Sequence, residues 1–255
     1  MEIATSADGT GIAFDRTGDG PALVLVGGAL STRGAAAGIA AHLAARFTVV
    51  SYDRRGRGDS GDTPPYAVSR EVEDLAGVME ATGAHAVYGH SSGAIVALEA
   101  TVAGVPVHRL AVYEPPYILE GTRSRTSGLD GRVAALVDEG RRGDAVKLFL
   151  SEAVQLPDEV VAGAAASPAW PSMEAIAPTL VYDLTLAGDN LIPERLSSVA
   201  VPVLAVDGGD SAEWMRAAVA AVAATIPGCR YVTLPGQGHG AADAALAPVL
   251  AEFFG

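Results

Sequence analysis

The stretch Tyr88-Gly-His-Ser-Ser-Gly-Ala94 contains the pattern Gly-x-Ser-x-Gly, with Ser91 at its centre. The apolar run 84–87 precedes it, and a sequence with good helix propensity follows it. In a tight turn from a strand to a helix, a central serine projects beyond the edge of the sheet, and glycines prevent clashes on either side of it. Because both neighbours fit this context, the sequence predicts a strand–turn–helix unit that presents Ser91 as a nucleophile.

Outward from this turn, short apolar runs alternate with longer helical stretches. We expect strands at 22–26, 47–51, 84–88, 109–113, 201–207 and 229–234, and helices at 34–46, 69–82, after Ser91, at 211–225 and at 241–254. Residues 2–6 and 11–16 predict a hairpin around Asp8-Gly9. The alternation indicates βαβ units. The sequence therefore predicts an α/β fold with a mainly parallel eight-stranded sheet flanked by helices.

The alternation is interrupted after Pro115-Pro116. Between about 117 and 199 the sequence predicts helical pieces but no buried strand, at 130–142, 144–152, 158–166 and 172–187. We therefore predict a core formed by 1–116 and 200–255, with a helical lid inserted at 117–199. The alternative is that these helices only pack on the core and have no gating role.

Composition narrows the classes of function. The 255 residues are 49% hydrophobic and carry a formal net charge of −13, which disfavours nucleic acid and anionic membranes as partners. The single cysteine, Cys229, rules out an internal disulfide or a thiol–metal site, and no dinucleotide, phosphate-loop or metal motif is present. We expect no metal or organic cofactor. The first residues resemble no signal peptide, so we expect a cytoplasmic protein. The sequence does not indicate an oligomeric state.

A serine nucleophile needs a base, and the chain offers five histidines. His239 lies in the glycine-rich loop Pro235-Gly-Gln-Gly-His-Gly, between the last predicted strand and the last predicted helix. His90 lies inside the turn itself, where its ring would point away from the Ser91 hydroxyl, and it is predicted to be structural or to line the pocket. His239 is therefore the candidate base.

With these pieces in order, the chain resembles the α/β-hydrolase family over nearly its whole length. The matching motifs are Val24-Leu-Val-Gly-Gly, Tyr52-Asp-Arg-Arg-Gly-Arg-Gly-Asp-Ser60, the serine turn, and Gly-His-Gly near the end. The resemblance implies Ser91 as nucleophile, His239 as base, and an acid between them in sequence.

The resemblance also implies an oxyanion hole made of two backbone N–H groups. The turn supplies the N–H of Ser92, and the loop after the third strand supplies that of Ala29, with Gly28 as the second choice. Many relatives carry a histidine where this chain has Gly27. The stretch 53–60 is interpreted as a structural turn in which Asp53 and the arginines tie loops together.

Two residues are candidates for the acid. The usual family location follows the seventh strand, where Asp210 stands one residue earlier than the family pattern places it. A second location follows the sixth strand, where Glu114 comes 23 residues after Ser91. An acid flanked by apolar sequence is costly unless it is paired. The sequence favours Glu114 over Asp210 and leaves both open.

The predicted function is a serine hydrolase that cleaves a small or medium acyl substrate, such as an ester, thioester or lactone, through an acyl-enzyme on Ser91. The alternatives are a C–C bond hydrolase, a perhydrolase-like enzyme and a non-catalytic binding protein with this fold. An all-apolar pocket would favour a simple ester, whereas polar groups would favour a dienol substrate. Candidate pocket residues are Tyr117, Trp170, Met173, Tyr182, Trp214 and Met215.

Overall fold

The computed structural model of the protein describes residues 1–119, 128–189 and 191–255, and an eight-stranded sheet forms its centre. The strands are β1 (Glu2–Thr5), β2 (Gly11–Thr17), β3 (Ala22–Val26), β4 (Thr48–Tyr52), β5 (Ala86–His90), β6 (Arg109–Tyr113), β7 (Val203–Gly208) and β8 (Arg230–Leu234), in the spatial order β1-β2-β4-β3-β5-β6-β7-β8. Strand β2 pairs antiparallel with β1 and β4, and every other pairing is parallel. The predicted sheet and hairpin are confirmed.

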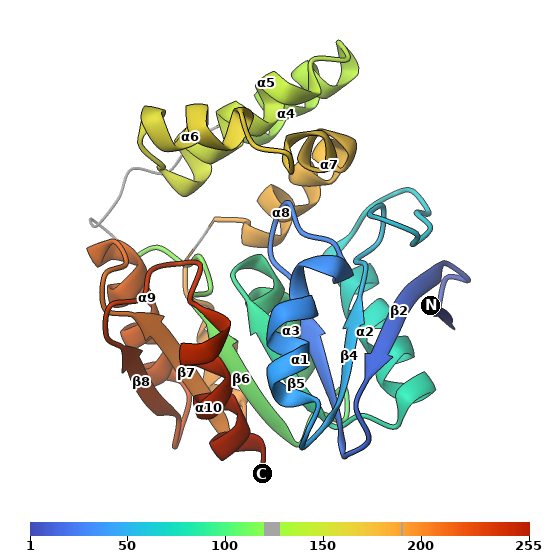
Figure 1. Ribbon diagram of the computed structural model, residues 1–255, viewed down its shortest axis with the longest axis vertical. Coiled ribbons are helices and arrows are strands. Elements are labelled where there is room, and N and C mark those ends of the chain that lie inside the picture. Colours follow the sequence, from blue (N-terminus) through green and yellow to red (C-terminus); the bar gives the residue numbers. More distant parts are fainter. Residues whose placement is uncertain (120–127, 190) are drawn as a thin grey trace.

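Helices cover both faces of the sheet (Figure 1). Helices α1 (Ala37–Leu43) and α10 (Asp243–Phe254) pack on one face, and α2 (Val68–Thr82), α3 (Ser92–Val102) and α9 (Glu213–Thr225) pack on the other. Strand β3 shows why the central strands are continuously apolar: Leu23 and Leu25 face the first layer, and Val24 and Val26 face the second. The core thus consists of two apolar layers, one on each side of the sheet.

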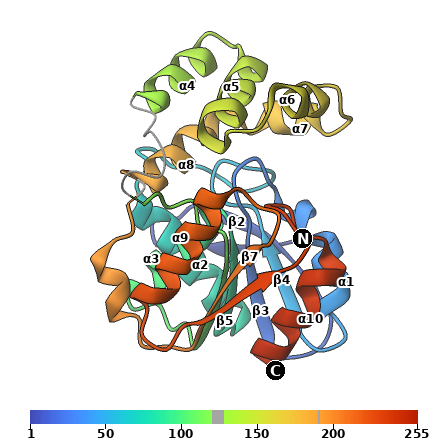
Figure 2. The same ribbon diagram turned by 90° about the vertical axis from the view of Figure 1, so that its left-hand side faces the viewer.

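A group of helices lies between β6 and β7 in the chain, and we call it the helical insertion. Its elements are α4 (Leu129–Asp138), α5 (Arg142–Leu148), a π-helical turn η2 (Phe149–Val154), α6 (Asp158–Ala165), α7 (Trp170–Ala175), η3 (Ala177–Thr179) and α8 (Leu180–Ala187). Two further 3₁₀ segments pack on the core: η1 (Arg33–Ala36) precedes α1, and η4 (Glu194–Ser198) joins the insertion to β7 and contacts α3 and α9. Figures 1 and 2 show α4 to α7 as a layer above the sheet, with α8 between this layer and the core. The insertion buries its own apolar cluster.

The helix boundaries within the insertion correct the sequence prediction in two places. The predicted helix 130–142 ends at Asp138, close to Gly140 with φ +75°, and α5 starts afresh at Arg142. The predicted helix 172–187 is divided into α7, η3 and α8, because Pro178 cannot donate the hydrogen bond that would continue a helix. Parts of the predicted lid, residues 120–127 and 190, lie outside the described residues. Opening and closing of the insertion stays a prediction.

Candidate active site

Ser91 lies in the turn between β5 and α3, with φ 54° and ψ −124°. A positive φ at a non-glycine residue is strained and persists only where the surroundings impose it. Here the surroundings are crowded: a Cβ atom at Gly93 would clash with the backbone carbonyl of Val26, and one at Gly89 would clash with the start of α3. The N–H of Ser91 donates to the carbonyl of Tyr113 at 2.8 Å. The turn therefore holds the Ser91 side chain above the carboxyl end of the sheet.

Three side chains from separate loops form a chain of hydrogen bonds. The Nε2 atom of His239 lies 3.1 Å from Oγ of Ser91, and its Nδ1 lies 2.7 Å from Oε2 of Glu114. The other oxygen of Glu114 accepts the N–H of Gly208 at 2.8 Å. Burial would raise the pKa of Glu114, but the bonds from His239 and Gly208 lower it below its ordinary value. An ionised Glu114 keeps the proton on Nδ1 and leaves Nε2 free to accept from Ser91.

The alternative acid, Asp210, is not the carboxylate that the structure places beside His239. Its side chain is exposed in the loop after β7, its own N–H donates to the carbonyl of Gln237, and no hydrogen bond within the described residues joins its carboxylate to His239. Gly208, two residues before Asp210, donates its N–H to Glu114. The Glu114 carboxylate is thereby held beside the imidazole of His239, where Asp210 would otherwise have to lie.

His90 supports the loop that carries His239. Its Nε2–H donates to the backbone carbonyl of His239 at 2.8 Å, and the two rings lie 4.9 Å apart. Burial and the neighbouring His239 lower the pKa of His90 to about 4. His90 is therefore neutral in the folded protein at neutral pH and acts as a hydrogen-bond donor to the loop.

This lowered pKa predicts a pH-dependent stability. As the pH falls from the ordinary value of 6.5 toward 4, the unfolded chain binds a proton at His90 that the folded chain does not bind. The free energy of unfolding should fall with pH across this window, by about 3 kcal/mol in total. Urea unfolding of the wild type and of His90→Gln, which keeps a donor for the His239 carbonyl, measures the effect. Identical pH slopes in the two proteins would contradict it.

The predicted oxyanion residues surround Ser91. Gly28, Ala29 and Ser92 all line the same cavity as Ser91 and His239. In the described part of the chain the N–H groups of Ala29 and Ser92 have no hydrogen-bond partner, which for Ser92 follows from its place as the first residue of α3. A Cβ atom at Gly28 would lie 3.0 Å from the Ser91 side chain, a tight contact, so glycine favours this close approach of the loop.

The cavity above Ser91 has a volume of about 410 Å³ and lies between the sheet and the helical insertion. Apolar side chains from both parts make up most of its wall: Leu30, Pro116, Ile118, Phe149, Leu150, Leu156, Met173, Leu184, Trp214 and Met215. Three of the six predicted pocket residues, Met173, Trp214 and Met215, are among them.

The other three predicted pocket residues, Tyr117, Trp170 and Tyr182, do not line this cavity. Tyr117 is buried in the core beside α3, and Trp170 borders a recess between α5 and α7. Tyr182 lies on a different face of α8 from Asp183 and Leu184, which do line the cavity. Its hydroxyl donates to Asp62 at 2.6 Å and its ring stacks on Tyr66. The orientation of the helices decides the positions of Trp170 and Tyr182, and the composition of the sequence does not reveal it.

Asp183 is a residue of the cavity that was not predicted from the sequence. It lies in α8, lines the cavity, and is 3% exposed. Its partners come from the turn at 53–60, where Arg54 and Arg57 are buried and both bind its carboxylate. The only sequence signal is an acid within the apolar run 180–187. The interpretation of 53–60 as a turn that ties loops together agrees with these contacts and with the ion pair between Asp53 and Arg33.

The described residues contain no group of three or more His, Cys, Asp or Glu side chains placed to hold a metal ion. In the same part of the chain, every helix is too short or too polar to cross a bilayer.

The fold and the arrangement of Ser91, His239 and Glu114 are typical of one class of enzyme fold, and comparisons with known proteins indicate the same class. Residues 23–252 match the family model described as Alpha/beta hydrolase family, so the chain belongs to the α/β-hydrolase family. An α/β hydrolase from Sphaerobacter thermophilus is 53% identical with a TM-score of 0.96, and the match covers 100% of both chains.

More distant solved structures share the fold. A hydrolase from Pseudomonas aeruginosa is 22% identical, with a TM-score of 0.79 over 100% of this chain and 98% of the other. The esterase RhEst1 from Rhodococcus sp. is 22% identical, with a TM-score of 0.74 over 99% and 97%. At this identity the likeness concerns the fold alone.

Proposed function

We propose that the protein is a serine hydrolase that cleaves a neutral, mainly apolar ester through an acyl-enzyme on Ser91. The observation that carries this proposal is the hydrogen-bonded series Glu114–His239–Ser91, with distances of 2.7 and 3.1 Å, which opens into an apolar cavity. An activated nucleophile is recognised by such a base, which a third group orients.

In the proposed reaction, Ser91 Oγ attacks the ester carbonyl carbon while His239 Nε2 takes the hydroxyl proton. The N–H groups of Ala29 and Ser92 bind the oxygen that becomes negative. His239 then gives the proton to the leaving alcohol as the C–O bond breaks. Water, deprotonated by the same nitrogen, attacks the acyl-enzyme, and breakdown of the second tetrahedral intermediate frees the acid and restores the Ser91 hydroxyl.

The lining of the cavity supports a neutral substrate. Among its described lining residues there is no lysine or arginine, and its two acids, Glu114 and Asp183, are both engaged in hydrogen bonds. A substrate carboxylate would therefore lose water without gaining a cationic partner. An alkyl acyl chain would instead contact side chains such as Phe149, Leu184 and Met215.

Pre-steady-state hydrolysis of two matched esters tests the proposal. We expect p-nitrophenyl hexanoate to release a burst of about one nitrophenolate per protein chain wherever deacylation is the slower step, and a slow linear phase to follow. The mono-p-nitrophenyl ester of adipic acid, which has the same six-carbon chain but ends in a carboxylate, should give a kcat/KM about 100-fold lower. The two acyl chains have the same number of carbons and differ at the end, where a carboxylate replaces the methyl group.

If neither ester nor a longer neutral ester is hydrolysed by folded protein, the proposed function fails and the non-catalytic alternative takes its place. If both esters react equally well, hydrolysis stands and the proposed preference for neutral substrates fails.

A further inference from the structure

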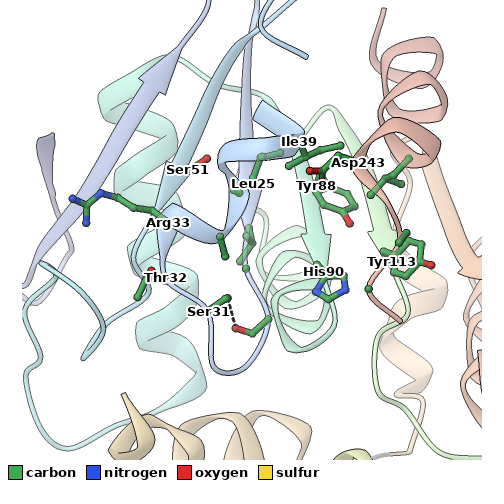
Figure 3. A pocket seen from close by; sticks show the side chains of 18 of the residues that line it. Leu25, Ser31, Thr32, Arg33, Ile39, Ser51, Tyr88, His90, Tyr113 and Asp243 are labelled. Carbon is green, nitrogen blue, oxygen red and sulfur yellow. Dashed lines mark hydrogen bonds between the residues drawn. The ribbon is translucent and has the colours of Figure 1, made fainter. Parts of the chain in front are cut away.

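The loop at 27–31, which we call the oxyanion loop, lies between two cavities. The active-site cavity is on one side, and a second cavity of about 280 Å³ is on the other. Both are bordered by Gly28, Ala29 and His90. Figure 3 shows the second cavity, with Leu25, Tyr88 and Tyr113 around it. A loop with open space on both sides has few packing contacts to fix its orientation. Other interactions must hold it.

The carbonyl oxygen of Gly28 accepts two hydrogen bonds that hold the oxyanion loop in place. Arg57 Nη1 donates to it at 2.7 Å, and Ser31 Oγ donates to it at 2.7 Å, as the dashed line in Figure 3 shows. In a planar trans peptide the C=O and the following N–H point in opposite directions. Fixing the Gly28 carbonyl therefore fixes the direction of the Ala29 N–H. A charged donor on the carbonyl also polarises the peptide and makes this N–H a stronger donor.

Arg57 is in turn held by the helical insertion. Its Nη2 donates to Asp183 Oδ2 at 2.8 Å, and its Nε donates to Thr179 Oγ1 at 3.1 Å. The other carboxylate oxygen, Asp183 Oδ1, accepts from Ser92 Oγ at 2.8 Å and from Arg54 at 2.8 Å. One carboxylate of α8 thus connects to both residues whose N–H groups face the reacting carbonyl.

The cluster is neutral and almost completely buried. Arg54 and Arg57 are balanced by Glu71 and Asp183, and all four are at most 3% exposed. Burial would raise the pKa of Asp183, but the attraction of Arg57 and Arg54 lowers it below its ordinary value. Separating α8 from the core would leave two buried guanidinium groups with one carboxylate, which is strongly unfavourable.

We propose that Arg57 and Asp183 are positioning residues through which the helical insertion sets the oxyanion hole. The inference rests on the proposed serine hydrolase function. One arginine of the turn at 53–60, Arg57, thereby gains a role at the site, because it binds the oxyanion loop. In this loop many relatives of the family carry a histidine where this chain has Gly27. The inference also predicts that any movement of the insertion that displaces α8 disassembles the oxyanion hole.

Arg57→Lys tests the inference, because lysine keeps the positive charge but cannot contact Gly28, Asp183 and Thr179 together. We expect kcat for p-nitrophenyl hexanoate to fall about 30-fold, below the ~100- to 1,000-fold that the loss of an oxyanion donor costs, with KM changed less than about threefold. The Ki of an alkyl boronic acid, whose tetrahedral adduct on serine mimics the oxyanion, should rise by a similar factor. Circular dichroism and complete fluorophosphonate labelling, seen by intact mass, establish that the variant is folded and keeps a reactive Ser91.

Arg55→Lys is the matched control. Arg55 is as buried as Arg57 and is paired with Asp74 and Asp8, but it contacts neither the oxyanion loop nor Asp183. Its replacement should reduce stability in the same way and leave kcat and the boronic acid Ki within about twofold of the wild type. Equal kinetic losses in Arg55→Lys and Arg57→Lys would overturn the inference, since both effects would then be structural.

Ser31→Ala removes the other bond to the Gly28 carbonyl and tests the same idea without disturbing the buried cluster. Its kcat should fall about fivefold, with a parallel rise in the boronic acid Ki. If Arg57→Lys does not fold, Ser31→Ala alone tests the inference. An unchanged kcat and an unchanged boronic acid Ki in Ser31→Ala would then overturn it. A folded wild type that hydrolyses no neutral ester instead overturns the proposed function, so the two failures are distinguishable.

Discussion

Ser91→Ala should lower kcat for p-nitrophenyl hexanoate by about 10⁶-fold, because among the described residues that line the cavity no other hydroxyl is both next to the base and near the oxyanion donors. His239 Nε2 lies 3.1 Å from Oγ of Ser91, whereas the adjacent Ser92 Oγ is buried and donates to Asp183. The substitution removes one oxygen from a residue whose backbone strain is unchanged, so the fold should remain intact. Steady-state kinetics with active-site titration measures the loss.

Ser92→Ala is the natural control for this experiment, because it removes the neighbouring hydroxyl but keeps the backbone N–H that faces the substrate. It should lose no more than about tenfold in kcat, in line with the loss of the two hydrogen bonds that the hydroxyl makes, one to Asp183 and one from Arg54. Intact-mass analysis after treatment with a fluorophosphonate gives an independent measurement: one adduct on the wild type and on Ser92→Ala, and none on Ser91→Ala. An adduct retained on Ser91→Ala would remove Ser91 from its proposed role.

Local patterns explain why most of the fold could be predicted. The turn at Ser91 is specified by residues within a few positions of it, and so are the hairpin around Asp8-Gly9 and each central strand. The helical insertion was harder to predict, because its short helices depend on where the chain turns. Pro178 and Gly140 divide helices that periodicity alone would continue.

The acid and the pocket depend on contacts between distant segments. Glu114 and Asp210 both follow a strand, and only the register of β6 against β7 brings the Gly208 N–H to Glu114. The orientation of α8 likewise places Asp183 in the site and Tyr182 on a different face. No spacing in the sequence encodes the pair of Arg57 and Asp183, which are 126 positions apart.

The acid gives the second large expected effect. Glu114→Gln should lower kcat by about 10⁴-fold, whereas Asp210→Asn should change it less than about twofold. The amide of glutamine fills the space of the carboxylate and can still accept the Gly208 N–H, so the loop geometry persists. It removes the negative charge that stabilises the imidazolium, and its NH₂ group would favour the tautomer of His239 with the proton on Nε2. That tautomer donates toward Ser91 and cannot accept the hydroxyl proton.

The two acid variants form a matched pair, since each replaces one carboxylate in a loop at the same edge of the sheet by its amide. Thermal unfolding of both proteins shows whether the structure is retained, and the fluorophosphonate reaction rate reports the activation of Ser91 without a substrate. We expect that rate to fall with kcat in Glu114→Gln and to be unchanged in Asp210→Asn. Similar, small losses in both variants would mean that neither carboxylate orients His239, and the bond of 2.7 Å between Glu114 and the imidazole would then only hold the loop in place.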